Sequence, residues 1–347
     1  NFRQITIKFL KMTILVTGGL GYIGSHTVVE LLQNNFEVVI IDDLSNTEKF
    51  ILKNIEEITG KKPIFYPFDL KRKELLKQVF DAHQIEGCIH FAAYKAVGES
   101  QVKPIDYYEN NLFSLINLLQ EMKERNISNF IFSSSCTVYG QADKMPIDEN
   151  TPLKLPESSY GKTKQMGEEI LQNIAAAGGA NVILLRYFNP VGAHSSAEIG
   201  ELPIGVPQNL VPFITQTGIG LREQLSVYGD DYPTPDGTAI RDYIHVVDLA
   251  KAHVVAMHRL VENKNLEKVE TFNLGTGTGS SVLEVINAFE KVSGKKLPYK
   301  IVGRREGDVI SAYANTDKAN QVLGWKAELT LEESLASAWK WEQKIRS

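Results

Sequence analysis

Two patterns of hydrophobic and polar positions alternate along the first half of the chain. Short apolar runs rich in β-branched residues predict buried strands at 13–17, 38–41, 63–66, 87–91, 130–132 and 182–185. Between them lie helical spacings, such as the one with apolar positions Ile23, Val28, Leu31 and Leu32 that ends at Asn34. This alternation predicts an α/β fold built on a Rossmann-type doubly wound parallel sheet.

The sequence pattern changes after Asn189, where predicted loops rich in Pro and Gly alternate with short elements. We predict a first domain over 12–188 and a smaller, mixed α/β C-terminal substrate domain over 189–347. The two are expected to interleave, because the strand-like segment 270–274 suits the sheet of the first domain. Residues 1–11 have no place in this fold and are interpreted as an extension or tag.

The composition of the chain indicates its cellular compartment and its classes of binding partner. The net charge of −5 over 347 residues gives no nucleic-acid signal. No apolar run approaches the roughly 18 residues that span a membrane. The two cysteines, Cys88 and Cys136, fall in expected strand contexts far apart in the sequence, which predicts free thiols in a reducing compartment. We therefore expect a cytoplasmic protein without a nucleic-acid, membrane or metal partner.

A glycine-rich turn follows the first predicted strand. Its glycines, Gly18, Gly21 and Gly24, permit a tight turn, close approach of backbone to a pyrophosphate, and close packing of the next helix. The N-terminus of that helix offers N–H groups to an anion. At the end of the second strand, Asp42 is placed to bind an adenosine ribose, and no arginine lies beside it for a 2′-phosphate. The pattern favours NAD over NADP.

Tyr160 and Lys164 are four residues apart on a predicted helix and share one face. A phenol ionises near pH ~10, and nearby positive charge favours its phenolate, so Lys164, together with a bound cationic nicotinamide, is expected to turn Tyr160 into a base. A strand end, Ser133 to Ser135, lies upstream. Taken by itself, the spacing also suits a surface tyrosine and a solvated lysine.

Longer motifs surround these residues. They are Val16 to Gly19 with Gly21 to His26, His90 to Ala93 with Lys95 to Ser100, Phe132 to Ser135, Leu185 to His194, Arg241 to His245, and Arg304 to Asp308. On these motifs, from Met12 to about Trp341, the chain resembles the extended short-chain dehydrogenase/reductase family and, within it, the UDP-glucose 4-epimerase family. The domains are then an NAD-binding domain and a UDP-sugar-binding domain.

The resemblance implies NAD-dependent interconversion of UDP-galactose and UDP-glucose through a transient 4-keto sugar. Tyr160 would take the proton of the sugar 4-hydroxyl, Ser135 would bind the same oxygen, and Lys164 would tune the phenol and contact the nicotinamide ribose. Thr137 is an alternative to Ser135. The family also implies a homodimer, formed through the helices at 104–125 and 159–177.

Further binding residues are carried over from the family. Those expected at the cofactor are Gly18, Gly21, Tyr22, Ile23, Gly24, Asp42, Asn46, Asp69, Leu70, Phe91, Ala92, Lys95, Asn110, Tyr160, Lys164 and Tyr187. Those expected at the substrate are Lys95, Ser135, Thr137, Tyr160, Asn189, Asn209, Leu210, Tyr228, Arg241, Arg305, Asp308 and Ala312. Two alternatives stay open: Asp69 as the cap of the following helix, and 304–308 as a charged surface turn.

Ala312 aligns with the position that gates the hexose pocket in the family, where a tyrosine narrows the pocket. An alanine leaves room for a 2-acetamido group. We therefore predict that UDP-N-acetylgalactosamine and UDP-N-acetylglucosamine are also interconverted. The alternatives are that neighbouring residues fill the space, or that Tyr313 takes the gate through a one-residue shift.

Two other functions are weighed against the epimerase. A sugar-nucleotide 4,6-dehydratase carries an Asp-Glu pair after the strand-end hydroxyl, where this chain has Cys136, Thr137 and Val138. A catalytically silent NAD sensor would have no need of a tuned base, so an intact Tyr160 and Lys164 argue against it.

Overall fold

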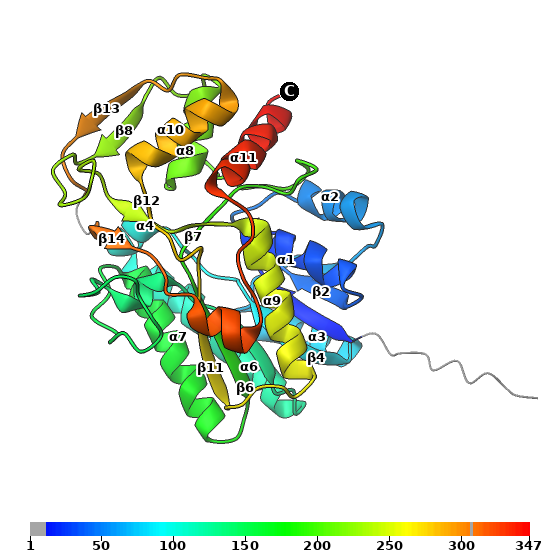
Figure 1. The fold of residues 1–347 in the computed structure, drawn as a ribbon. Helices are drawn as coiled ribbons and strands as arrows, with labels where there is room; N and C mark the ends of the chain where they lie inside the picture. The colour runs from blue at the N-terminus through cyan, green and yellow to red at the C-terminus, as the bar shows by residue number, and fades with distance from the viewer. Residues whose placement is uncertain (1–11, 306–307) are drawn as a thin grey trace, which may run out of the picture.

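A seven-stranded parallel sheet forms the centre of the protein, in a computed structural model that describes residues 12–305 and 308–347 (Figure 1). Its strand order is β11-β6-β5-β4-β1-β2-β3. The strands are β1 (Thr13–Thr17), β2 (Glu37–Ile41), β3 (Ile64–Tyr66), β4 (Ile85–His90), β5 (Asn129–Ser133), β6 (Asn181–Tyr187) and β11 (Val269–Leu274). The predicted Rossmann-type sheet is confirmed, while the expected extension at 1–11 lies outside the described residues.

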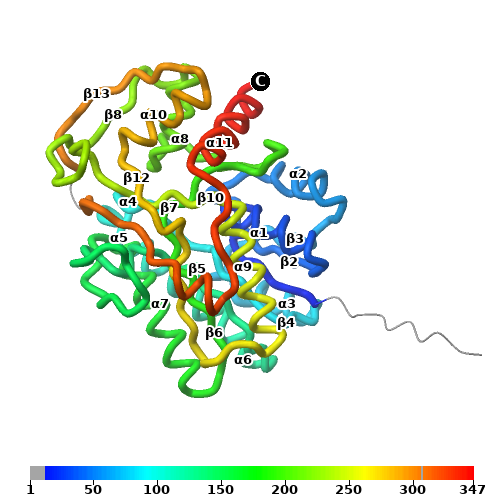
Figure 2. Tube along the Cα trace, in the orientation of Figure 1, coloured from blue at the N-terminus to red at the C-terminus, as the bar shows by residue number. Residues whose placement is uncertain are grey.

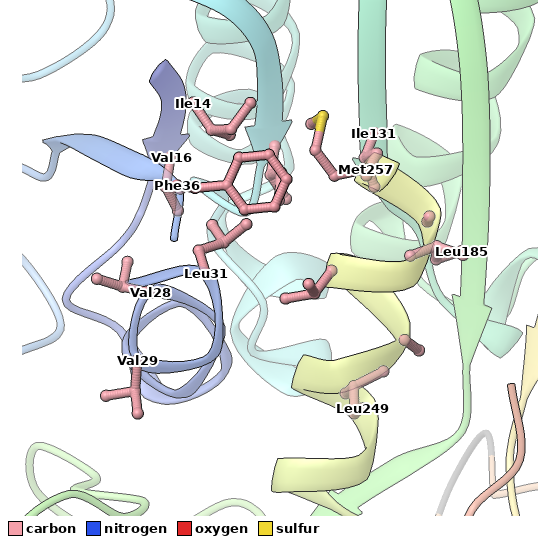
Figure 3. Close-up of a cluster of buried hydrophobic side chains, with 14 of the residues drawn as sticks. Ile14, Val16, Val28, Val29, Leu31, Phe36, Ile131, Leu185, Leu249 and Met257 are labelled. Carbon is pink, nitrogen blue, oxygen red and sulfur yellow. The ribbon is translucent and has the colours of Figure 1, made fainter. Parts of the chain in front are cut away.

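Successive residues of each strand point to opposite faces of the sheet, so both faces need a cover. Ile14 and Val16 of β1 pack in a cluster with α1 (Tyr22–Gln33), α2 (Phe50–Thr59) and α9 (Val246–Val261) (Figure 3). Leu15, between them, packs on the other face with α3 (Lys73–Ala82), α6 (Ser114–Glu124) and α7 (Ser159–Ala176). Each such side chain, fully buried, contributes about 1.5–3 kcal/mol.

A second region lies beyond the carboxyl ends of the sheet strands and has a core of its own (Figure 1). Its helices are α8 (Leu210–Gly218), α10 (Val282–Ser293) and α11 (Leu331–Ile345). Its short strands are β7 (Asn189–Val191) with β10 (Tyr243–His245), β8 (Leu225–Tyr228) with β13 (Tyr299–Val302), and β9 (Ile240–Arg241) with β12 (Ser280–Ser281) and β14 (Ser311–Ala312).

The remaining short helices lie in the connections. They are α4 (Val97–Val102), α5 (Pro104–Tyr108), the π-helix η1 (Glu109–Phe113), the 3₁₀ helix η2 (Cys136–Tyr139) and the π-helix η3 (Ala319–Leu323). Cys136 therefore opens a 3₁₀ helix and does not lie in a strand, contrary to our expectation, whereas Cys88 is buried in β4. Both cysteines are free.

The chain passes between the two regions more than once, as its trace shows (Figure 2). Strand β11 pairs in parallel with β6 along its whole length, at the edge of the central sheet. Helix α9 packs on the same sheet against β5 and β6, although it too follows residue 189. A division of the chain at residues 188 and 189 stays a prediction.

His253 of α9 gives the fold a pH dependence. Its ring is fully buried beside Phe91, and burial lowers its pKa to about 4. As the pH falls below 6.5, the unfolded chain takes up a proton here that the folded protein does not, so stability is lost.

The parent should lose about 2 kcal/mol more unfolding free energy than the variant His253→Phe when the pH is lowered from 7 to 5. The difference arises because phenylalanine has no proton to take up in either state. Urea unfolding of both proteins at the two pH values measures it. An equal difference at both pH values would contradict the assignment.

Candidate active site

The predicted cofactor residues follow neighbouring strands of the central sheet. Gly18 follows β1, Asp42 follows β2 and Phe91 follows β4, while the catalytic candidate Ser135 is the second residue after β5. Because parallel strands have their carboxyl ends on the same side of a sheet, these residues lie close together at those ends. The chain order reverses between β1 and β4, which pair directly, and this is the place where doubly wound sheets bind ligands.

The glycine turn is a closely packed backbone cradle. Gly18 has φ +69°, and its N–H donates to the Ile41 carbonyl at 2.8 Å. A Cβ on Gly24 would lie 2.1 Å from the Gly18 carbonyl oxygen. Among the described residues, no side chain caps helix α1 and no acid lies in its first turn. The N–H groups and dipole of this helix therefore suit a pyrophosphate, so the turn fits NAD.

Asp42 is held at the end of β2 by two backbone donors. Its Oδ2 accepts from the Leu20 N–H at 3.0 Å, and its Oδ1 accepts from the Leu44 N–H at 2.9 Å. Each carboxylate oxygen keeps a lone pair for a ribose hydroxyl. Burial raises the pKa of Asp42.

Asp69 does not cap the next helix. Helix α3 starts at Lys73, and Asp69 instead accepts from the Lys71 N–H at 2.8 Å, which forms a local turn. The remaining cofactor candidates lie around the same edge or next to it: Asn46 after β2, Leu70 after β3, Ala92 and Lys95 after β4, Asn110 in η1, and Tyr187 at the end of β6.

Helix α7 brings Tyr160 and Lys164 to the end of β5. The helix begins after Ser158, whose hydroxyl accepts from the Gly161 N–H at 3.1 Å. Tyr160 is 8% exposed and Lys164 is 4% exposed, so the alternative of a surface tyrosine and a solvated lysine is wrong. The Lys164 ammonium lies 5.9 Å from the centre of the Tyr160 ring.

Burial shifts the pKa values of both members of this pair in the protein alone. Burial raises the pKa of Tyr160 above its ordinary value, and the nearby Ser135 hydroxyl offsets only part of this shift. The Lys164 ammonium donates to the Ser133 carbonyl at 2.7 Å, and burial lowers its pKa to about 8. In the protein alone, therefore, Tyr160 is a protonated phenol, because desolvation dominates.

Ser135 and Thr137 both place a hydroxyl near this end of β5. Ser135 accepts from the Thr137 N–H at 3.3 Å, where η2 begins. The Thr137 hydroxyl is buried and lacks a hydrogen-bond partner within the described residues. A buried hydroxyl of this kind costs free energy unless a ligand atom pairs with it. The choice between the two hydroxyls stays open.

The predicted diphosphate and uridine residues come from the second region. Arg241 of β9 donates to the Asp308 carboxylate at 2.7 Å. The Arg305 guanidinium lies 5.9 Å from the ring centre of Tyr228. Asn189 begins β7, and Asn209 directly precedes Leu210, the first residue of α8. Exposed Arg304 pairs with Asp231 instead, as in the surface turn that we considered.

Sequence reasoning missed Glu201. Its carboxylate accepts from the Asn209 side-chain amide at 2.7 Å and lies 3.8 Å from the Lys95 ammonium. It therefore joins a residue after β4 to a residue at the start of α8. No spacing in the chain signals this, because Glu201 stands in a loop far from Lys95. A second connection is the Tyr22 hydroxyl, which donates to the Gly192 carbonyl at 2.6 Å.

Residues 12–305 and 308–347 contain neither a metal-binding cluster nor a membrane-spanning helix. Within these ranges, no group of three or more His, Cys, Asp or Glu side chains is placed to hold a metal ion. Within the same ranges, every helix is too short or too polar to cross a membrane.

Known proteins resemble the chain along most of its length. Residues 15–338 match the model of the family described as GDP-mannose 4,6 dehydratase. The UDP-glucose 4-epimerase of Bacillus subtilis is 50% identical over 332 residues, which cover 95% of this chain and 97% of that protein. The UDP-glucose 4-epimerase of Mus musculus is 48% identical over 338 residues, which cover 95% and 96%. The chain belongs to the UDP-glucose 4-epimerase family.

A solved member of this family has the same fold. The UDP-glucose 4-epimerase of Bifidobacterium longum, in complex with NAD+ and UDP, matches with a TM-score of 0.92 and 47% identity. The match covers 96% of this chain and 99% of that one. The matching family model carries the name of a dehydratase, yet positions 136–138 of the present chain are Cys, Thr and Val and supply no carboxylate for elimination of water.

Proposed function

We propose that this protein is an NAD-dependent UDP-glucose 4-epimerase that interconverts UDP-galactose and UDP-glucose. The observation that carries the proposal is the meeting of Ser135, Tyr160 and Lys164, all buried, at the sheet edge that also holds the glycine turn. Relatives that are 48–50% identical over 95% of the chain are UDP-glucose 4-epimerases. A silent NAD sensor would have no use for these three residues.

The protein's own residues would hold NAD along the sheet edge. The glycine turn would take the pyrophosphate, Asp42 the adenosine ribose, and Lys164 the nicotinamide ribose. The chemistry that NAD supplies when bound is the reversible acceptance of a hydride, which epimerisation without net oxidation requires. Positive charge brought close to Tyr160 would also lower the pKa of its phenol, which burial has raised.

Tyr160 would exchange a proton with the sugar 4-hydroxyl. The Ser135 hydroxyl is close enough to favour the ionised phenol, so both hydroxyls can converge on one sugar oxygen. Lys164, held by the Ser133 carbonyl, places its charge on the same side of the helix. A general acid–base group of this kind contributes about 10²–10⁴-fold in rate.

The UDP part of the substrate would be gripped more firmly than the hexose. Arg241 and Arg305 offer guanidinium groups that suit phosphate oxygens, and Asn189 and Asn209 would add neutral donors. Asp308 and Tyr228 would lie around the uridine. A loosely held hexose can turn and present either face, which inversion at C4 demands.

An NMR experiment tests the proposed reaction. The purified protein is incubated with UDP-galactose, first without and then with added NAD, and the anomeric proton signals are followed. We expect signals of UDP-glucose at equilibrium with those of UDP-galactose. Loss of the C6 hydroxyl from the product would favour the dehydratase, and no change even with NAD would favour the silent sensor.

We also propose that the N-acetylated UDP-hexoses are substrates, on the basis of Ala312. The Ala312 side chain packs with Val138 and Phe188, beside the 3₁₀ helix that carries Cys136 and Thr137. Neighbouring residues of an extended segment point to opposite sides. Tyr313 accordingly lies near Gly279, where an added Cβ would come within 3.1 Å of its ring. This direction argues against Tyr313 as the gate.

Ala312→Tyr is expected to lower kcat/KM for UDP-N-acetylgalactosamine at least tenfold relative to UDP-galactose, because the phenol would occupy the space of the acetamido group. Initial rates with both sugars measure the ratio. Ala312→Ser, which stays small, is the control and should keep the parent ratio. An equal loss of both activities in Ala312→Tyr would contradict the steric explanation.

A homodimer is proposed through the helices at 104–125 (α5, η1 and α6) and 159–177 (α7). Large apolar side chains stand exposed in and just before the first of these segments: Val102 is 80% exposed, Ile105 76% and Phe113 54%. Clustered apolar surface of this kind marks an interface. We expect a mass in solution of twice the 38.7 kDa of the chain and a monomer after Ile105→Lys, both measured by sedimentation. A monomeric parent protein would contradict the proposal.

Free cysteines favour a cytoplasmic location.

A further inference from the structure

A buried ion pair lies directly behind the catalytic candidates. Glu168 follows Lys164 by one turn on α7, and Arg186 lies in β6. Their side chains are only 1% and 5% exposed. Arg186 donates from Nε to Glu168 Oε1 at 2.9 Å and from Nη2 to Oε2 at 2.5 Å. Arg186 belongs to one of the sequence motifs, yet the roles described so far do not involve it.

The ion pair holds the end of β5 from one side. The Ser134 hydroxyl donates to Glu168 Oε1 at 2.6 Å, and the Ser133 carbonyl accepts from the Lys164 ammonium at 2.7 Å. Two side chains one turn apart on α7 therefore hold two consecutive residues of the strand end. Ser135 is the next residue along the chain, so its position follows from theirs.

The same pair holds the other end of this segment. Arg186 Nη1 donates to the Tyr139 hydroxyl at 3.0 Å, and that hydroxyl donates to Asn273 Oδ1 of β11 at 2.7 Å. The guanidinium carbon also lies 4.9 Å from the centre of the Tyr139 ring. Tyr139 closes η2, which contains Thr137. Both candidate hydroxyls thus lie between two points that are tied to one ion pair.

Stability is a weak explanation for this arrangement. Taking both charges out of water largely cancels their attraction, and apolar side chains of similar volume often stabilise a core as well. What an ion pair adds is direction, because the guanidinium fork and the carboxylate accept only certain partner geometries. Here every remaining bond of the pair is directed at residues 134 and 139, on either side of the candidate hydroxyls.

We propose that Glu168 and Arg186 are positioning residues for the epimerase reaction. Through Ser134 and Tyr139 they fix the segment that carries Ser135 and Thr137 against Tyr160. This inference rests on the proposed function, because it assigns the network to the rate of that reaction.

Ser134→Ala tests the inference while leaving both charges in place. We expect kcat for UDP-galactose to fall about tenfold, because a small displacement of a catalytic hydroxyl is costly in rate. KM, the amount of bound NAD and the Tm should stay close to the parent values. Ser334→Ala is the matched control, since Ser334 is equally buried and its hydroxyl donates to the carbonyl of Thr330, the residue that caps α11. It should keep the parent kcat.

Tyr139→Phe loosens the opposite end and gives a second, independent variant. It should show the same fall in kcat with unchanged KM. If the parent epimerises and both variants keep its kcat, or if they change only Tm, KM or NAD content, the positioning role is overturned and the epimerase assignment stands. If the parent itself has no epimerase activity, the proposed function fails, and the inference fails with it.

Discussion

Replacing Tyr160 with phenylalanine is expected to lower kcat for UDP-galactose by about 10²–10⁴-fold while the protein keeps its fold and its NAD. The substitution removes one oxygen atom and leaves a ring of the same shape in a position that is 8% exposed. Without the phenol, the sugar 4-hydroxyl loses its proton acceptor, and Ser135 cannot replace it, because a neutral alcohol is a much weaker base than a phenolate.

The rate of UDP-glucose formation measures this effect, with NAD content and Tm recorded for the same samples. Tyr243→Phe is a suitable control, since Tyr243 is 7% exposed and has no assigned role in the reaction. Turnover of Tyr160→Phe within a few-fold of the parent would show that another group exchanges the proton. In that case Thr137, with its unpaired buried hydroxyl, would be the first residue to examine.

Gly24→Ala is expected to abolish NAD retention and, with it, the activity. The added Cβ would lie 2.1 Å from the Gly18 carbonyl oxygen and 2.9 Å from the Gly19 Cα. Both are backbone atoms and cannot rotate away. The start of α1 must therefore move from the end of β1, and the cradle for the pyrophosphate is lost. Such overpacking also costs about 1–3 kcal/mol of stability.

Nucleotide released on denaturation, together with titration of added NAD, measures this prediction. We expect no bound NAD after purification and at least a hundredfold loss of affinity. Gly98→Ala is the matched control, because Gly98 lies in α4 with no heavy atom within 4 Å of its added Cβ. If Gly24→Ala retained NAD at the parent level, the glycine turn would not be the pyrophosphate site.

Much of the fold and part of the site follow from local pattern. The apolar runs predicted at 13–17 and 182–185 became β1 and β6, because a strand buried on both faces must be apolar throughout. The position of Tyr160 relative to Lys164 follows from helical spacing alone. The glycine turn was likewise predictable, since only glycine fits where the backbone of Gly24 touches that of Gly18.

Other predictions failed because they depended on surroundings that no short pattern contains. Asp69 is a residue type that often caps a helix, yet α3 starts at Lys73, too far along the chain for Asp69 to cap it. The pKa of the Tyr160 phenol likewise depends on its surroundings: in the protein alone its burial raises this pKa, and a lowered pKa with NAD bound stays a prediction. Cys136 follows a strand and opens a 3₁₀ helix instead of continuing it.

The sequence by itself determined the doubly wound sheet, the glycine turn and the pairing of Tyr160 with Lys164, because each depends on neighbours within a few residues or on a strict period. Only the tertiary structure decided that Glu168 pairs with Arg186, that Glu201 joins Lys95 to Asn209, and that Ala312 faces the 3₁₀ helix. These contacts join residues of different elements, and some of them, such as Lys95 and Glu201, lie far apart in the chain. The packing of the folded chain decides which partner each of these side chains has and how far it is removed from water. The sequence pattern predicts only which face of a helix or strand is buried.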